Sequence, residues 1–171
     1  PPMKTLVLPC AGRSSRFPDL PPKWMLQNDN KESMIESVIG AMPEDFDRTI
    51  ITITQQQQDQ WGAFDFLNLR VKEGVDIDIL SQPTNSASET VYQTIQDCHV
   101  EGSVTIKDCD CKVEYKECAS LNFIVGINVK RDSDIKRLEA KSFIEKNDNN
   151  IIEDIIEKKM VSNDICVGVY S

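Results

Sequence analysis

Short apolar and β-branched runs recur along the chain at a length typical of strands. They occupy residues 5–8, 49–54, 104–107, 121–129 and 165–170, and a further strand is predicted over 75–80, where Val75, Ile77 and Ile79 alternate with other residues. Residues 140–146 and 151–158 flank Asn147-Asp148-Asn149-Asn150, a composition typical of a hairpin turn. The hairpin predicts antiparallel strands in the last third of the chain.

Helical patterns fall between the early strands. Met34, Ile35, Val38, Ile39 and Met42 recur at helical spacing and predict a helix near 31–42, which Pro43 ends. The glutamine run at 55–58 begins a polar helical link, and Ser86-x-x-Glu89 predicts a capping box that opens another helix. Because strands alternate with helices, we expect an α/β fold with a mixed, mostly parallel sheet flanked by helices.

Composition narrows the class of partner. The chain has 171 residues, 19 basic and 28 acidic side chains, and a formal net charge of −9. This balance argues against a general nucleic-acid or anionic-membrane surface, which needs a positive field. No apolar stretch approaches the roughly 20 residues that span a bilayer, and the first residues lack a signal-peptide pattern. We therefore expect a cytoplasmic protein with reduced cysteines, and the sequence leaves its oligomeric state open.

The loop after the first strand reverses the sign of the chain's charge. This segment contains three basic residues (Arg13, Arg16 and Lys23) and one acidic residue, Asp19, so its local charge is positive. Gly12 lets the backbone approach a ligand. Such a loop can offer a nest of N–H donors to phosphate. The alternative is a surface loop with solvated basic residues.

A pair of carboxylates follows the strand at 104–107. Residues two apart share a face of a strand, so Asp108 and Asp110 are expected to project together. Hard oxygen ligands of this kind favour Mg²⁺ or Mn²⁺, and two turn aspartates without a ligand are the alternative. A basic phosphate loop and a carboxylate pair at one sheet edge together describe a nucleotide–metal site.

These residues lie in segments that resemble sugar-phosphate nucleotidylyltransferases, especially the capsule-biosynthesis type. The resemblance runs from about residue 4 to 170. The segments that carry it are Leu8-Pro9-Cys10-Ala11-Gly12-Arg13-Ser14-Ser15-Arg16-Phe17-Pro18, Pro22-Lys23-Trp24-Met25-Leu26, Ser86-Ala87-Ser88-Glu89-Thr90-Val91, Ile106-Lys107-Asp108-Cys109-Asp110 and Glu157-Lys158-Lys159. It implies a Rossmann-like (GT-A-like) nucleotidyltransferase fold.

The resemblance also assigns roles to matching residues. It implies that a loop backbone cradles the base and phosphates, that a basic pair handles the triphosphate, and that Asp110, with Asp108 beside it, holds Mg²⁺ or Mn²⁺. Glu157 and Lys158 match a pair that holds the acceptor. The implied loop is formed by Leu8, Pro9, Cys10, Ala11, Gly12 and Arg13, the basic pair is Arg16 and Lys23, and the base-reading region contains Gln82 and Ser88.

The implied reaction transfers a nucleoside monophosphate from a triphosphate to a phosphomonoester and releases pyrophosphate. CTP is the first expectation, ahead of dTTP and UTP, with a sugar 1-phosphate or another small phosphomonoester as acceptor, for capsule or surface polysaccharide precursors. No general base is required, because a phosphomonoester with a second pKa near 6 is mostly dianionic at pH 7.

The chain departs from the family in two respects, one of which is that the connections at residues 27–31 and 55–74 look short. Family members supply a second metal aspartate on a later strand, which this sequence does not contain. We therefore expect residues 1–171 to form one nucleotidyltransferase domain that lacks C-terminal residues or some loops of the family. Two other functions stay open: an Asp-x-Asp glycosyltransferase that uses an NDP-sugar, and a non-catalytic nucleotide-binding module.

Overall fold

The computed structural model describes residues 2–13, 17–43, 45–120, 122–131 and 134–171. The chain divides into two compact units. The first comprises residues 1–121 with Ser171, and the second comprises residues 122–170. No helix in the described ranges is both long enough and apolar enough to cross a membrane.

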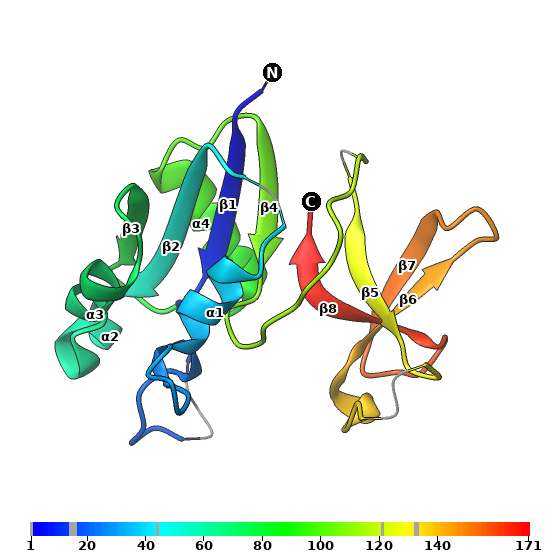
Figure 1. The fold of residues 1–171 in the computed structure, drawn as a ribbon, viewed down its shortest axis with the longest axis horizontal. Helices are drawn as coiled ribbons and strands as arrows, with labels where there is room; N and C mark the ends of the chain where they lie inside the picture. Colours follow the sequence, from blue (N-terminus) through cyan, green and yellow to red (C-terminus); the bar gives the residue numbers. More distant parts are fainter. Residues whose placement is uncertain (1, 14–16, 44, 121, 132–133) are drawn as a thin grey trace. The chain divides into compact units, whose positions relative to one another are not determined.

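A parallel sheet forms the centre of the first unit (Figure 1). Its strands lie in the order β3 (Val75–Leu80), β2 (Arg48–Thr54), β1 (Lys4–Pro9) and β4 (Ser103–Lys107). Val7, at the centre of β1, is in register with Ile50 on one side and Ile106 on the other. The predicted parallel sheet and its strands are confirmed, and the sheet brings the carboxyl ends of β1 and β4 together.

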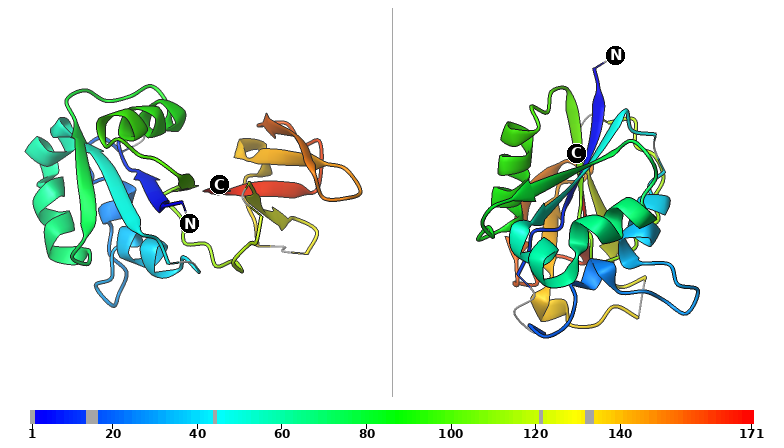
Figure 2. Two further views of the ribbon diagram at one scale, coloured as in Figure 1. Left: turned by 90° about the horizontal axis from the view of Figure 1, so that it is seen from above. Right: turned by 90° about the vertical axis from the view of Figure 1, so that its left-hand side faces the viewer.

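Helices cover both faces of this sheet. α1 (Met34–Gly40) and α4 (Ala87–Asp97) lie on opposite sides of it (Figures 1 and 2). Side chains alternate along the strands, so Leu6 and Leu8 of β1 pack with the α1 side, in one core cluster with Ile35. On the other side, the Thr52 and Thr94 hydroxyls lie 2.5 Å apart. The expected arrangement of a sheet flanked by helices is confirmed.

Two helical predictions differ in detail from the structure. α1 is shorter than the predicted 31–42, because Ser33 caps it in a reciprocal capping box with Glu36. At α4, Ser86 accepts a hydrogen bond from the Glu89 N–H, but the Glu89 carboxylate accepts from the Asn85 N–H at 2.7 Å. The glutamine run does begin a helix, α2 (Gln55–Trp61), and an unpredicted helix, α3 (Ala63–Arg70), follows it.

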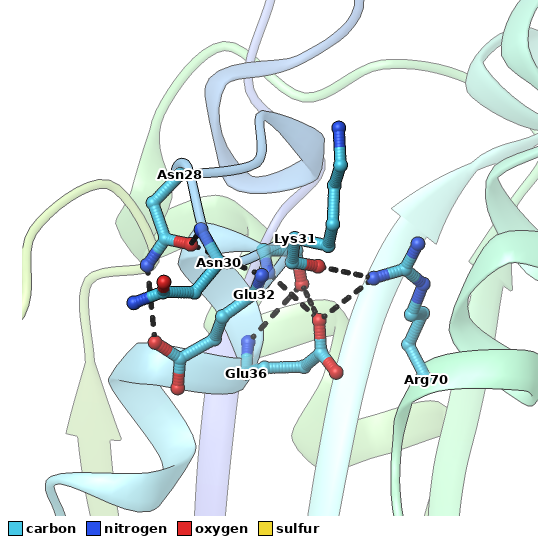
Figure 3. A network of polar contacts seen from close by, with 7 residues as sticks. Asn28, Asn30, Lys31, Glu32, Glu36 and Arg70 are labelled. Atoms are coloured by element: carbon cyan, nitrogen blue, oxygen red, sulfur yellow. Dashed lines mark hydrogen bonds and ion pairs between the residues drawn. The ribbon is translucent and has the colours of Figure 1, made fainter.

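The segment after the short helix η1 (Lys23–Met25) is fixed to α3 by polar contacts (Figure 3). Arg70, at the end of α3, donates from Nη1 to the Lys31 carbonyl oxygen at 2.7 Å and to Glu36 Oε2 at 3.4 Å. Glu36 Oε2 also accepts from the Ser33 backbone N–H at 2.8 Å. One guanidinium therefore ties the loop before α1, and α1 itself, to α3.

The second unit is antiparallel. β5 (Ile124–Asn128) pairs with β8 (Asp164–Tyr170), β8 with β6 (Ser142–Lys146), and β6 with β7 (Ile152–Glu157). A short helix, η2 (Leu138–Ala140), precedes β6. The predicted hairpin is confirmed as β6 and β7, whereas β5 is shorter than the predicted run 121–129, of which Leu121 lies outside the described residues.

Candidate active site

A cleft of about 460 Å³ opens at the carboxyl ends of β1 and β4. Its walls come from three parts of the chain. They are the end of β1 with the loop that follows it (Pro9, Cys10, Gly12 and Arg13), the segment around η1 (Phe17, residues 20–24 and Leu26), and residues 108–110 after β4. In α/β sheets, ligands bind beyond the carboxyl ends of the strands, where such loops meet. Both segments that the sequence marks as chemically suggestive therefore contribute to one cleft.

The loop after β1 is held on both sides by hydrogen bonds. The Cys10 N–H donates to the Thr52 carbonyl at 2.8 Å, and the Gln57 side chain donates to the Cys10 carbonyl at 2.8 Å. A Cβ added at Gly12 would meet nothing within 4 Å, and Gly12 does not use a positive φ. Gly12 therefore leaves space for a ligand to approach the backbone, and it does not serve to allow an unusual backbone conformation.

Lys23 and Asp110 face each other across the cleft. Lys23 Nζ lies 3.8 Å from Asp110 Oδ2, and the side chains are 59% and 54% exposed. An exposed pair of this kind contributes only about 0–1 kcal/mol, so both groups remain available to a charged ligand. The next residue, Trp24, is 3% exposed and packs edge-on against Phe66, with ring centroids 6.2 Å apart. This buried indole fixes the backbone from which Lys23 projects.

The two aspartates do not lie on a strand, which corrects the sequence prediction. β4 ends at Lys107, and Asp108 and Asp110 follow in a turn that gives them different surroundings. Asp110 is exposed, whereas burial raises the pKa of the Asp108 carboxyl; the Asp110 charge raises it further and the Lys107 charge opposes both. The carboxylates belong to one turn but do not form a symmetric pair.

Lys107 fixes this turn from inside the protein. Its side chain is fully buried, and Nζ donates to the carbonyl oxygens of Asp108, at 2.5 Å, and Cys111, at 2.8 Å. The Cys111 Sγ lies 3.7 Å from the same nitrogen. An ammonium with these partners closes the turn and sets the direction in which Asp110 leaves it.

The cysteines near the cleft are free thiols, as are the others. Cys109 Sγ donates to the Pro9 carbonyl at 3.4 Å and so links the turn to β1. Burial raises the pKa of the Cys10 thiol well above its usual value, and a hydrogen bond with Cys109 adds to this effect. Within the described ranges, no group of three or more His, Cys, Asp or Glu side chains could hold a metal ion.

The remaining candidate residues of the first unit are dispersed around the cleft. Leu8 is buried in β1, and Ala11 lines a second hollow of about 440 Å³ that also contains Gln57. Arg13 lines the cleft, this second hollow and a third one of about 300 Å³ beside residues 84–87. Gln82 and Ser88 are exposed and line none of the three.

Three further residues were predicted to belong to the site. Arg16 lies outside the described residues. Glu157 and Lys158 belong to the second unit, at and just after the end of β7, where Lys158 Nζ lies 2.8 Å from Glu157 Oε1. The ion pair is exposed, so its two charges are open to solvent and to a ligand.

Two residues of the site were missed by the sequence analysis. Lys107 has a recognisable signal, because it follows Thr105 at strand spacing and the two share the buried face of β4. Gln57 forms a capping box with Thr54, the Thr-x-x-Gln pattern of a helix start. The pattern indicates the cap but gives no sign that the same amide reaches Cys10.

Solved structures share the fold of this chain. No protein-family model and no curated protein matches the chain. Among solved structures, a nucleoside-diphosphate-sugar pyrophosphorylase from Vibrio cholerae RC9 matches with a TM-score of 0.72 and 18% identity, over 96% of this chain and 71% of that one.

Two further solved structures match over nearly the whole chain. The inositol-1-phosphate CTP transferase from T. maritima matches at 16% identity and a TM-score of 0.67, over 98% of this chain and 69% of that one. A UDP-glucose pyrophosphorylase, complexed with UDP-glucose, matches at 15% identity and the same TM-score, over 98% and 75%. At these identities the likeness establishes the Rossmann-like fold of nucleotidyltransferases, which the resemblance of the sequence segments had predicted.

Proposed function

We propose that the protein is a nucleotidyltransferase that transfers a nucleoside monophosphate from a triphosphate to a small phosphomonoester. One observation carries the proposal: Lys23 and Asp110, from segments 87 residues apart, face each other at 3.8 Å in a cleft that the loop after β1 also lines. A cation, a carboxylate and backbone amides around one cavity are the groups that a triphosphate with its metal requires. The fold shared with three enzymes of nucleotide transfer supports the same chemistry.

Within this proposal each segment has a task. The backbone of residues 8–12, with Arg13, binds the nucleotide, and Lys23 and Arg16 neutralise charge that develops on the departing pyrophosphate. Gln82 and Ser88 belong to the base-reading region, and Glu157 with Lys158 holds the acceptor. These roles follow the sequence resemblance, and the site geometry supports those of Lys23 and the loop.

The carboxylates fit a divalent cation of the Mg²⁺ or Mn²⁺ type. Asp110 offers an exposed carboxylate at the cleft, and Asp108 lies two residues before it. Mg²⁺ is usually held by one or two protein carboxylates, with phosphate oxygens and waters completing its shell. Asp110, with Asp108 beside it, would hold such an ion, which would neutralise part of the negative charge of the triphosphate.

The proposed reaction needs positioning rather than a general base. An oxygen of the acceptor phosphate forms a bond to the α-phosphorus, the bond from that phosphorus to the bridging oxygen breaks, and its electron pair leaves with pyrophosphate. The acceptor is already dianionic at neutral pH, so no side chain has to remove a proton. CTP is the first candidate donor, followed by dTTP and UTP, with acceptors for capsule or surface polysaccharide precursors.

Pyrophosphate release tests the proposal directly. We expect release from one of the triphosphates in the presence of Mg²⁺ and an acceptor chosen from sugar 1-phosphates, phosphocholine and glycerol phosphate. Lys23→Ala should lower kcat/KM about 10²–10³-fold, the loss typical of one positioned electrostatic group. Lys72→Ala, which removes an exposed lysine outside the cleft, should leave the rate unchanged.

Other outcomes identify the alternatives. Consumption of an NDP-sugar without use of a triphosphate would favour an Asp-x-Asp glycosyltransferase. Triphosphate binding that never leads to pyrophosphate release would favour a binding module. Equal rates for the Lys23 and Lys72 variants would contradict the phosphate role of Lys23.

A further inference from the structure

The side chain of Gln57 connects α2 to residues 10–13 of the loop after β1, which we call the nucleotide loop. Its Nε2 donates to the Cys10 carbonyl at 2.8 Å and approaches the Gly12 carbonyl at 3.5 Å. Its Oε1 accepts the Thr54 N–H at 2.9 Å. The amide orientation is fixed by chemistry, because a backbone N–H can only donate and the Cys10 carbonyl can only accept. Gln57 is buried, so this link is not exchanged with water.

The link determines where the loop's N–H groups point. A trans peptide unit is planar, with its C=O and N–H directed to opposite sides. When Gln57 holds the Cys10 carbonyl, it turns the Ala11 N–H away from itself, and a held Gly12 carbonyl does the same to the Arg13 N–H. Within the described part of the chain, the N–H groups of Ala11, Gly12 and Arg13 have no hydrogen-bond partner.

We propose that Gln57 is a positioning residue that keeps the nucleotide loop in its anion-binding conformation. It draws two carbonyl oxygens, which would repel phosphate, out of the way and leaves successive N–H donors for the triphosphate. The inference rests on the proposed function, and it gives a task to one member of the glutamine run, since Gln55 and Gln58 have other partners. Gln55, for example, is exposed and donates to Asp59 Oδ1 at 2.8 Å.

The test compares two isosteric substitutions in the same helical turn. Gln57→Glu keeps an acceptor for the Thr54 N–H but places a carboxylate oxygen against the Cys10 carbonyl. The probe is CTP, unless dTTP or UTP stabilises the native protein more than CTP does. We expect the Kd and KM for this triphosphate to rise about tenfold, which corresponds to about the free energy of one hydrogen bond. The value of kcat should change little, since the loop binds nucleotide in the ground state. Gln55→Glu, which adds the same charge, should leave both constants unchanged.

Each result bears on a defined conclusion. If the native protein binds no triphosphate, the proposed function fails. If it binds one and Gln57→Glu binds equally well, the positioning role fails while the proposed function stands. Should Gln57→Glu not fold, Gln57→Met, which has neither a donor nor a charge, carries the same measurement. Failure of both variants to fold would overturn the inference, because Gln57 would then serve stability alone.

Discussion

At the scale of single residues, Lys107 is the least expected feature of the site. A buried ammonium costs several kcal/mol of desolvation, which it recovers only through its hydrogen bonds. Here its partners are backbone carbonyls of Asp108 and Cys111, in the turn that carries Asp110. Because the hydrogen bonds of the Lys107 side chain serve only this turn, we infer that Lys107 contributes more to the geometry of the turn than to the stability of the fold.

Lys107→Met should therefore separate stability from activity. The substitution removes a buried charge together with two charge-assisted hydrogen bonds of about 1.5–3 kcal/mol each, so the gains and losses largely offset. We expect the free energy of unfolding to change by less than about 2 kcal/mol while kcat/KM falls about 10–100-fold, because a displacement near 1 Å can cost about 10²-fold. Urea denaturation and pyrophosphate release measure the two quantities.

The control for this substitution is Lys112→Met. Lys112 is exposed, and its Nζ lies 2.9 Å from Glu114 Oε1. The variant should match the native protein in both stability and rate. A Lys107→Met protein with native activity would show that Asp110 does not depend on this turn geometry.

At the scale of elements, the position of Lys23 depends on contacts that η1 and the following segment make with α3. Trp24 packs against Phe66, and the Arg70 guanidinium lies over the same ring, 5.2 Å from its centroid. Arg70 also holds Glu36 and the Lys31 carbonyl (Figure 3). The cleft wall that carries Lys23 is therefore braced by a helix that contributes no residue to the cleft.

The Glu36 carboxylate makes this brace sensitive to pH. Burial acts to raise its pKa, but hydrogen bonds from Ser33 and the charge of Arg70 outweigh burial and lower the pKa below its usual value. A carboxyl with a lowered pKa stabilises the folded state above its unfolded-state pKa, and this contribution disappears as the pH falls through the folded-state value.

Glu36→Gln should therefore cost about 0.5–1 kcal/mol at pH 7, as expected for a half-buried ion pair, and less at pH 3, where more of the native carboxyl is protonated. Urea midpoints at the two pH values measure the difference. Glu73→Gln, which changes the same charge on an exposed turn residue, should show no comparable pH-dependent loss. A constant penalty at both pH values would mean that Arg70 does not interact with the charged form.

Sequence patterns predicted these elements unequally. The parallel strands were recognisable because β1, β2 and β4 are short runs rich in apolar or β-branched residues, whereas β3 alternates apolar with acidic residues. α3 was missed because its apolar residues do not keep to one face: Leu67 is fully buried, whereas Leu69 is 85% exposed. Its boundary with α2 depends on Gly62 at φ 62°, which the composition of the segment does not reveal.

Residue types were enough to mark the basic loop and the acidic pair, the two segments that line the candidate cleft. Residue types were not enough where the geometry of the cleft depends on long-range contacts or on where a strand ends. Gln57 reaches Cys10 across 47 residues, and Asp108 differs from Asp110 because the strand ends one residue before the pair. No local pattern contains either fact.

At the scale of the whole molecule, the charge distribution restricts where an anion can bind. The chain carries a net charge of −9, yet Arg13 and Lys23 line one cleft of the first unit. A generally negative surface repels polyanions, so this cleft, where Arg13 and Lys23 balance the carboxylates of Asp108 and Asp110, is more favourable to an anion than the acidic surface of the rest of the chain. A triphosphate should therefore affect the first unit selectively.

Hydrogen exchange can resolve this selectivity and the acceptor assignment together. A triphosphate with Mg²⁺ at a hundredfold excess over Kd stabilises the units that bind it by about 2.7 kcal/mol. We expect slower exchange in peptides covering residues 8–13 and 107–111, and unchanged exchange across the β6–β7 hairpin.

The acceptor is tested by adding it to the nucleotide complex. If Glu157 and Lys158 hold the acceptor phosphate, exchange should slow at the Lys158 N–H, which donates to the Lys141 carbonyl at 2.8 Å. Slower exchange in the hairpin with nucleotide alone would contradict the assignment of nucleotide binding to the first unit. Unchanged exchange at Lys158 after the acceptor is added would show that Glu157 and Lys158 do not bind the acceptor.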